Sequence, residues 1–304
     1  MWLRSIFWLI NMGNIDYYIH NCSISVAEGK DSIEHINRLI TSNIKSISDL
    51  QSIDTLICNA NGRITDSLQI LRIQEQLLIL GNSEVAEDTR KLIVSGIHWN
   101  EDVRIMNGDE ILSKISIIGY EDDLLEIIPK EYNRINNNWL NWKENYFKAS
   151  KHNGRIKIDV ILKTNEIGSF IMENFGPSCN KLVIEKWVDF RISNGILSFD
   201  EYKHNFLPSE LGLDKFVDLK KGCYPGQEIH ARLESREKRR KKILRFSSDK
   251  EIQLGKYLSG NGTKINITTS VGNSGFLIIN NLEEEIKINE FILKTDELDT
   301  IEIS

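Results

Sequence analysis

Residues 220–246 read KKGCYPGQEIHARLESREKRRKKILRF, and this is the most unusual stretch of the 304-residue chain. The YPGQ run at 224–227 fits a type II turn, because its proline presets φ at the second position and its glycine supplies the positive φ needed at the third. Such a turn would present Cys223 on a tightly bent, exposed backbone. Lys220 and Lys221 beside it would favour the thiolate, which is the form that reacts or ligates. The alternative is a structural turn around an inert cysteine.

Upstream of this stretch, helical and strand patterns interleave irregularly. Asn61-Gly62 between two apolar runs is a strong hairpin signal. The spacing predicts helices over 31–50, 83–99 and 177–193, and strands within 56–80, 115–120 and 156–163. The irregular order favours an α+β architecture over a regular βαβ series.

Downstream, the pattern changes near residue 245. From Phe246 onward, short alternating runs are separated by glycine-containing turns, and no helical pattern is convincing. We therefore predict a first domain over 13–245 and a small C-terminal β-barrel or sandwich over 246–304.

Composition excludes several classes of protein. Hydrophobic residues make up 40% and charged residues 27%, which excludes wholesale disorder. No apolar run reaches the ~18 residues that a membrane span needs. The opening MWLRSIFWLINM has no cleavage site after it and is not read as a signal peptide; translation could start at Met1 or at Met12.

The cysteines and the distribution of charge narrow the possible functions further. The four cysteines are far apart and show no metal-ligand spacing, so we expect reduced thiols in a cytoplasmic protein and no zinc site. The net charge is −6, but residues 220–245 carry ten Lys and Arg against three Asp and Glu, hence +7 there and −13 elsewhere. A basic segment on an acidic body fits an anionic small ligand better than a polyanion wrapped around the surface.

The octapeptide KGCYPGQE, followed by Ala231-Arg232, closely resembles the signature of the YgfZ-type folate-binding proteins. These belong to the superfamily of the glycine-cleavage T-protein, an aminomethyltransferase, which also includes iron–sulfur assembly factors. Further segments resemble the family in the right order: INRLITSNI (36–44), ANGRITDSLQI (60–70), FRISNGI (190–196) and LPSELGL (207–213). The resemblance implies an aminomethyltransferase-like folate-binding domain around a central cavity, followed by a small C-terminal β-barrel.

The resemblance also implies site residues. Cys223 would be the catalytic or otherwise essential thiol, acting as a nucleophile, a redox relay or a transient cluster ligand. The residues implied for binding tetrahydrofolate or a related folate are Asp66, Arg191, Glu210, Lys221, Tyr224, Gln227, Glu228 and Arg232. A pterin needs a carboxylate to accept its N–H donors, and Asp66 or Glu210 could serve. The chain departs from the T-protein pattern at three positions: one glycine of its GG-x-x-D-D motif is missing, Ser67 replaces the second aspartate, and Ser193 replaces a glutamate.

Three functions remain open at this point. The favoured one is a monomeric, folate-binding accessory protein of iron–sulfur cluster assembly or repair and tRNA modification. Its partners would be folate and iron–sulfur client proteins, including tRNA-thiolating enzymes, with no membrane partner. The first alternative is an aminomethyltransferase, which the lost second aspartate argues against. The second is an RNA-binding module that uses the basic patch at 220–245, although that patch lacks the aromatic side chains that usually stack on bases.

A catalytic pair of Cys223 with a histidine is not indicated. His230 follows Cys223 by seven residues, and on a strand that odd separation would put the two side chains on opposite faces. We expect all six histidines to be structural or exposed.

Overall fold

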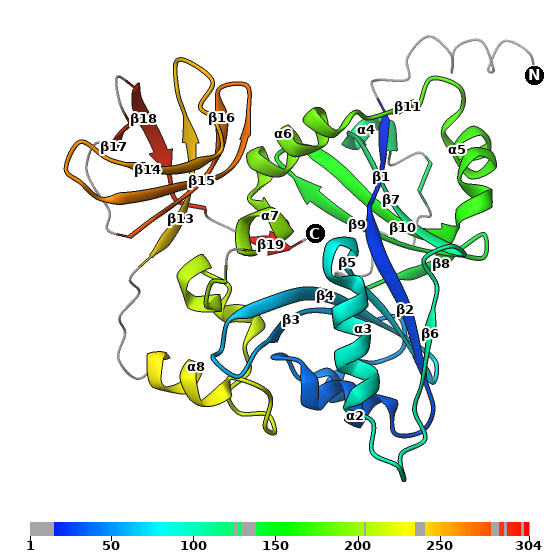
Figure 1. Cartoon of the computed structure of the whole chain (residues 1–304). Helices are drawn as coiled ribbons and strands as arrows, with labels where there is room; N and C mark the ends of the chain where they lie inside the picture. Colours follow the sequence, from blue (N-terminus) through cyan, green and yellow to red (C-terminus); the bar gives the residue numbers. More distant parts are fainter. Residues whose placement is uncertain are drawn as a thin grey trace, which may run out of the picture.

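The computed structural model describes residues 15–124, 127–128, 138–203, 205–234, 241–280, 286–288, 291–298 and 301–303. The opening MWLRSIFWLINM and most of the basic run EKRRKK (237–242) lie outside these residues. Two sheets and their helices form the larger part of the molecule, and a third, C-terminal sheet is set to one side of them (Figure 1).

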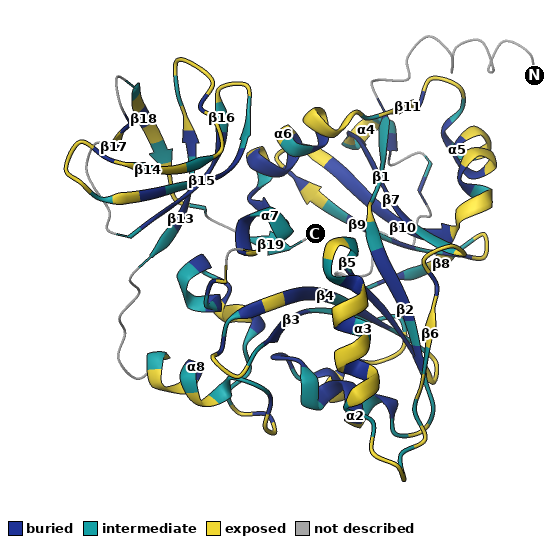
Figure 2. Ribbon diagram, in the orientation of Figure 1, coloured by how far each residue is buried: buried dark blue, intermediate teal, exposed yellow. Residues whose placement is uncertain are grey.

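The first sheet is built around two buried central strands, β7 and β10. Its strand order is β11-β1-β7-β10-β9-β8, with bounds Asn180–Lys181, Asp16–Ile19, Leu112–Tyr120, Arg155–Lys163, Asn145–His152 and Leu140–Trp142. β10 has the sequence RIKIDVILK and is buried at all seven inner positions (Figure 2). Its isoleucines and valine at even positions pack with Phe170 and Phe175 of helix α5 (Ile167–Phe175), so Lys157, Asp159 and Ile161 alternate onto the opposite face.

The second sheet contains the predicted hairpin. Its strand order is β3-β4-β5-β2-β6, with bounds Ser52–Cys58, Ile64–Ile73, Gln76–Asn82, Cys22–Glu28 and Arg104–Asn107. Helices α2 (Ser32–Leu39) and α3 (Ala86–Ser95) supply Ile36 and Ile93 to the core that covers one face. Where the two sheets meet, Ile161 of β10 packs with Ile24, Leu80 and neighbouring side chains of the second sheet.

The C-terminal sheet confirms the all-β pattern predicted for the end of the chain. Its strand order is β14-β15-β16-β13-β18-β17, with bounds Gly255–Leu258, Lys264–Val271, Ser274–Ile279, Lys242–Ser247, Phe291–Asp296 and Ile286–Ile288. The six strands curl into a nearly closed, barrel-like sheet (Figure 1). The chain then returns to the larger part, where β19 (Glu302–Ile303) pairs in parallel with β12 (Ile196–Leu197). The division at residues 245 and 246 stays a prediction.

The remaining described elements are helices and 3-10 helices. They are helices α4 (Glu121–Leu124), α6 (Ile184–Asn194), α7 (Phe199–Tyr202) and α8 (Gln227–Glu234), and 3-10 helices Ile44–Ser46, Ser83–Val85, Thr164–Glu166, Pro208–Leu211 and Asp214–Phe216. The predicted helix over 177–193 starts later than expected, at Ile184. The stretch after the YPGQ turn, considered above as a strand, is helix α8. No helix in the described part of the chain is long and apolar enough to cross a membrane.

Candidate functional site

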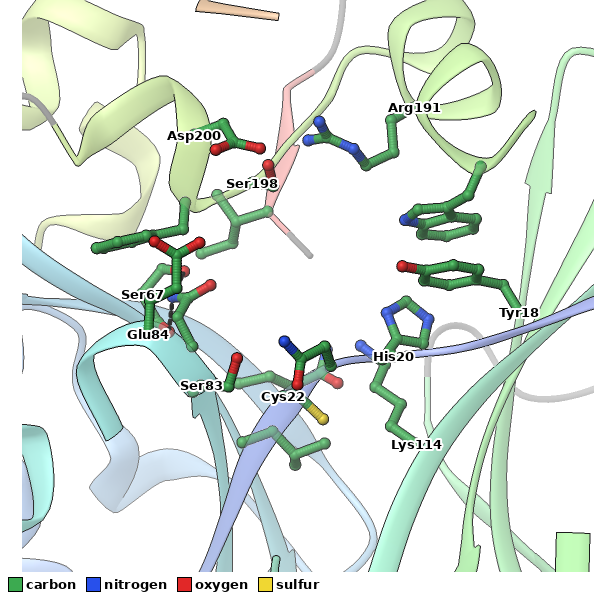
Figure 3. Close-up of a pocket in the computed structure, with 18 of the residues that line it drawn as sticks. Tyr18, His20, Cys22, Ser67, Ser83, Glu84, Lys114, Arg191, Ser198 and Asp200 are labelled. Carbon is green, nitrogen blue, oxygen red and sulfur yellow. Dashed lines mark hydrogen bonds between the residues drawn. The ribbon is translucent and has the colours of Figure 1, made fainter. Parts of the chain in front are cut away.

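A cavity of about 210 Å³ opens where the first two sheets meet helices α6 and α7 (Figure 3). Strands β1, β2, β4, β5 and β7 contribute side chains to its wall, as does Ile303 of the terminal strand β19. Of the residues predicted for the site, only Arg191 lines it. A second cavity, of about 490 Å³, is lined by residues that include Tyr120, His152 and Arg155, and by none of the predicted ones.

One wall of the central cavity is aromatic. Tyr18 of β1 and Trp187 of α6 lie face to face, with ring centroids 4.8 Å apart and an interplanar angle of 5°. His20 meets both rings edge-on, at 5.2 Å and 4.9 Å. This wall sets aromatic side chains next to polar groups, an arrangement typical of small-molecule sites.

Arg191 is held by a buried ion pair. Its Nη1 lies 3.0 Å from Oε2 of Glu201, and both side chains are at most 3% exposed. Glu201 also accepts hydrogen bonds from the backbone N–H of Ser198 at 2.6 Å and from the hydroxyl of Thr269. The pair therefore fixes the guanidinium at the cavity wall and joins α6, α7 and the C-terminal sheet.

Asp66 is turned away from the cavity. It is fully buried, and its carboxylate accepts hydrogen bonds from the backbone N–H of Ser67 (2.8 Å), from Nδ2 of Asn82 (2.6 Å) and from the hydroxyl of Thr89 (2.6 Å). Burial raises the pKa of Asp66 to about 6, although the hydrogen bonds from these donors act to lower it. Side chains alternate along strand β4, so Ser67 lines the cavity and bonds to Tyr202 instead.

Two carboxylates at the cavity were missed from the sequence. Glu84 and Asp200 both line it (Figure 3), and Asp200 accepts a hydrogen bond from Nζ of Lys203 at 2.6 Å. Carboxylates are the acceptors that the N–H edge of a pterin requires. Together with the aromatic wall, they make the cavity chemically suited to a small heterocycle that carries N–H donors.

The predicted signature residues form a separate cluster, built around Lys221. Nζ of Lys221 donates to the carbonyl oxygens of Asn37, Ile40 and Ser42 at 2.5, 2.7 and 2.9 Å. These carbonyls belong to the last turn of α2 and the residues after it, where unsatisfied carbonyls and the negative end of the helix dipole favour a cation. Lys221 thus anchors the signature segment to α2.

The YPGQ turn itself is confirmed, and it docks on the predicted hairpin. The N–H of Gln227 donates to the carbonyl of Tyr224 at 3.3 Å, and Gly226 has φ of +84°. A Cβ on Gly226 would lie 2.4 Å from Cα of Gly62 in the hairpin turn, so this close approach requires glycine. His230 of α8 completes the contact through a 2.7 Å hydrogen bond between its Nε2 and the Gly62 carbonyl.

Cys223 lies on the surface of this cluster. It is an exposed free thiol, and it does not line the central cavity. Cys58 and Cys179 are buried, and burial raises the pKa of each thiol to about 12. The turn therefore holds a thiol on the surface, close in sequence to Lys221 and Tyr224, whose side chains make structural contacts.

The other predicted residues also lie outside the cavity wall. Glu210 pairs with Lys241 at 2.9 Å and with Arg63 at 3.8 Å. Gln227 donates through its amide to the carbonyls of Leu219 and Lys221 at 3.3 and 3.4 Å. Tyr224 is 6% exposed and contacts His230, while Glu228 and Arg232 form an exposed pair one helical turn apart at 2.9 Å. Their roles in folate binding stay predictions.

A signal in the sequence could have pointed to the cavity. Lys157 and Asp159 interrupt the otherwise apolar run IKIDVILK, and charges on a buried strand mark either an ion pair or a site. The two do pair, with Nζ of Lys157 3.1 Å from Oδ2 of Asp159, and Lys114 of the cavity wall lies 4.0 Å from the same oxygen.

The chain was compared with known proteins, and relatives are found among aminomethyltransferases. No protein-family model matches the chain. The aminomethyltransferase of Caldanaerobacter subterraneus subsp. tengcongensis is 23% identical over 227 residues, covering 67% of this chain and 58% of that protein. The aminomethyltransferase of Thermotoga neapolitana is 25% identical over 89 residues, covering 29% and 24%. The matches thus span less than two thirds of the length of these relatives.

The structural comparison extends over nearly the whole chain. The crystal structure of the glycine cleavage system aminomethyltransferase T from Bartonella henselae superposes with a TM-score of 0.78 and 12% identity, covering 95% of this chain and 87% of that one. The chain therefore has the aminomethyltransferase T fold, and the relatives support its place in that superfamily.

Proposed function

With the aminomethyltransferase-like fold as premise, we propose that the chain is a folate-binding accessory protein that holds the ring of a reduced folate in the central cavity. The observation that carries the proposal is the cavity wall, which has the Tyr18–Trp187 stack on one side and the carboxylates of Glu84 and Asp200 on the other (Figure 3). A volume of about 210 Å³ is below the ~300–1,000 Å³ of pockets that enclose a whole drug-sized ligand. The cavity therefore suits the pterin ring, with the glutamyl part outside.

Transfer of an aminomethyl group is less well supported. In the T-protein pattern the carboxylate that handles the substrate amine stands near the position of Asp66, so the same reaction here would need Asp66 to be free. Asp66 accepts three short hydrogen bonds and is fully buried, and Ser67 faces the cavity in the position next to it. Binding without transfer agrees better with this arrangement.

The part of the proposal that concerns iron–sulfur client proteins rests on Cys223. We place the function in the maintenance of iron–sulfur proteins, including enzymes that thiolate tRNA, in a reducing cytoplasm and as a monomer. An exposed thiol outside the folate cavity could meet a client protein while folate stays bound. In a deletion strain, the Cys223→Ala variant should fail to restore iron–sulfur enzyme activity, and full restoration by this variant would overturn its role.

The folate side is tested by anaerobic equilibrium dialysis of the full chain with tetrahydrofolate. Saturable binding of one ligand per chain supports the proposal. No binding at millimolar ligand would overturn it and leave a scaffold or RNA role.

A second candidate, the aminomethyltransferase, is favoured by the names of the sequence relatives. An assay with an aminomethyl-lipoyl carrier protein and tetrahydrofolate separates the two functions. Our proposal predicts binding without turnover, and robust turnover would replace it with the enzyme.

A further inference from the structure

Behind the cavity wall, three polar side chains from neighbouring strands form a hydrogen-bonded chain. In the first sheet, Ser116 of β7 lies opposite Asp159 of β10, and His20 follows strand β1 on the other side. Oγ of Ser116 lies 2.5 Å from Oδ1 of Asp159 and 2.7 Å from Nε2 of His20. The chain runs from the buried interior to the cavity, where His20 is part of the wall (Figure 3).

The direction of each hydrogen bond follows from the charge on Asp159. Burial opposes its ionisation, but the ammonium groups of Lys157 and Lys114 outweigh burial and lower the pKa of the carboxyl. An ionised carboxylate only accepts, so the Ser116 hydroxyl must donate its single proton to Asp159. The Ser116 oxygen is then left to accept, and the donor must be the N–H at Nε2 of His20.

This arrangement fixes the tautomer of His20. With its proton on Nε2, a neutral imidazole carries a lone pair on Nδ1. Burial, followed by the charge of Lys114, holds the pKa of His20 well below its ordinary value; Lys157 and Arg191 act in the same direction and Asp159 in the opposite one. Among the described residues, no hydrogen-bond partner is found for Nδ1.

We propose that His20 presents Nδ1 to the cavity as a hydrogen-bond acceptor for an N–H group of the bound ligand, with Ser116 and Asp159 as its positioning residues. The ligand class is a planar nitrogen heterocycle that has an N–H donor on the edge facing His20. The identification of this ligand as a reduced pterin rests on the function proposed above. The assignment of the His20 tautomer does not depend on that function. A ligand whose edge offers only acceptors would face the lone pair on Nδ1. Its affinity should be lower by about 10-fold or more, which is the effect of one unmade hydrogen bond.

The first test reads the tautomer directly. Nitrogen NMR of the full chain labelled with ¹⁵N-histidine distinguishes a ring protonated on Nε2 from one protonated on Nδ1, and the His20→Gln variant assigns the signal. We expect the Nε2–H form from pH 6 to pH 8, and loss of this single fixed form in Ser116→Ala. A ring protonated on Nδ1, or on both nitrogens at pH 7, would overturn the proposal.

The second test adds ligands to the same sample: tetrahydrofolate, tetrahydropterin and guanine. The proposal predicts that at least one of them shifts the Nδ1 signal, and that its affinity falls about 10-fold in His20→Gln but not in His98→Gln, an exposed histidine outside the cavity. If another heterocycle produces the shift and tetrahydrofolate does not bind, the proposed function fails while this inference stands. If none shifts Nδ1, or His20→Gln binds as tightly as wild type, the inference is overturned.

Discussion

Replacing Lys221 by methionine should destabilise the protein through the end of helix α2. Methionine keeps the length of the side chain but removes the ammonium group, which leaves three carbonyls without their donor. All three belong to residues that are at most 5% exposed, so water cannot readily replace the lost bonds. At about 1 kcal/mol for each unsatisfied buried carbonyl, the low end of the usual range, the loss is about 3 kcal/mol.

The assay is thermal unfolding followed by circular dichroism. At roughly 2–4 °C per kcal/mol for chains of this order of size, the melting temperature of Lys221→Met should fall by about 6–12 °C. The matched control is Lys220→Met, the same change at the neighbouring exposed lysine, which should stay within about 0.5 kcal/mol of wild type. Equal melting temperatures for the two variants would refute the anchoring role of Lys221.

Three further predictions concern the signature turn, the buried charges and the thiols. Gly226→Ala should lower the free energy of unfolding by about 2 kcal/mol or more, because φ is +84° and a Cβ would clash with the hairpin. The control is Gly222→Ala, which has open space around it and should not be destabilising. Equal losses in the two variants would contradict the docking of the turn on the hairpin. Asp159→Asn should cost about 3 kcal/mol at pH 7, since two lysines lose their counter-charge. The wild-type carboxyl has a lowered pKa, so its stabilisation is complete above the ordinary Asp pKa of about 4 and is lost progressively as the pH falls below it; the gap between the two melting temperatures should narrow over that range, and a constant gap would contradict the pairing. Mass spectrometry after iodoacetamide treatment of the folded chain should find Cys223 alkylated well before the buried Cys58, whose pKa burial raises to about 12, and equal rates would contradict the model.

Local features of the fold could be predicted from the sequence. The hairpin at Asn61-Gly62 and the YPGQ turn depend on the backbone preferences of glycine and proline, which act within four residues. In residues 227–234, Ile229 and Leu233 are four positions apart, which is helical spacing. The prediction considered a strand there, and the structure has helix α8.

The placement of Asp66 shows a limit of sequence reasoning. The pattern identifies strand β4 but not which of two neighbouring residues faces the cavity, and a shift of one residue exchanges the two faces of a strand. Asp66 was therefore a reasonable candidate, yet its carboxylate is enclosed by donors from Asn82 and Thr89, which lie on other elements.

The cavity itself is assembled from distant parts of the chain. Tyr18 and Trp187 stack although 169 positions separate them in the printed sequence, and no local pattern specifies this pairing. The same holds for His20, Ser116 and Asp159, whose hydrogen bonds cross three strands. Sequence reasoning expected a central cavity through resemblance, but most of its wall could be identified only from the structure.

The most direct test of the central claim is calorimetric titration of tetrahydrofolate into two variants with a tryptophan at neighbouring positions. Ile184 and Val183 are both about half exposed, but only Ile184 lines the cavity. If folate binds there, Ile184→Trp should weaken binding by about 10-fold or more, while Val183→Trp should bind as wild type does. Wild-type affinity in both variants would contradict the assignment of the folate ring to this cavity.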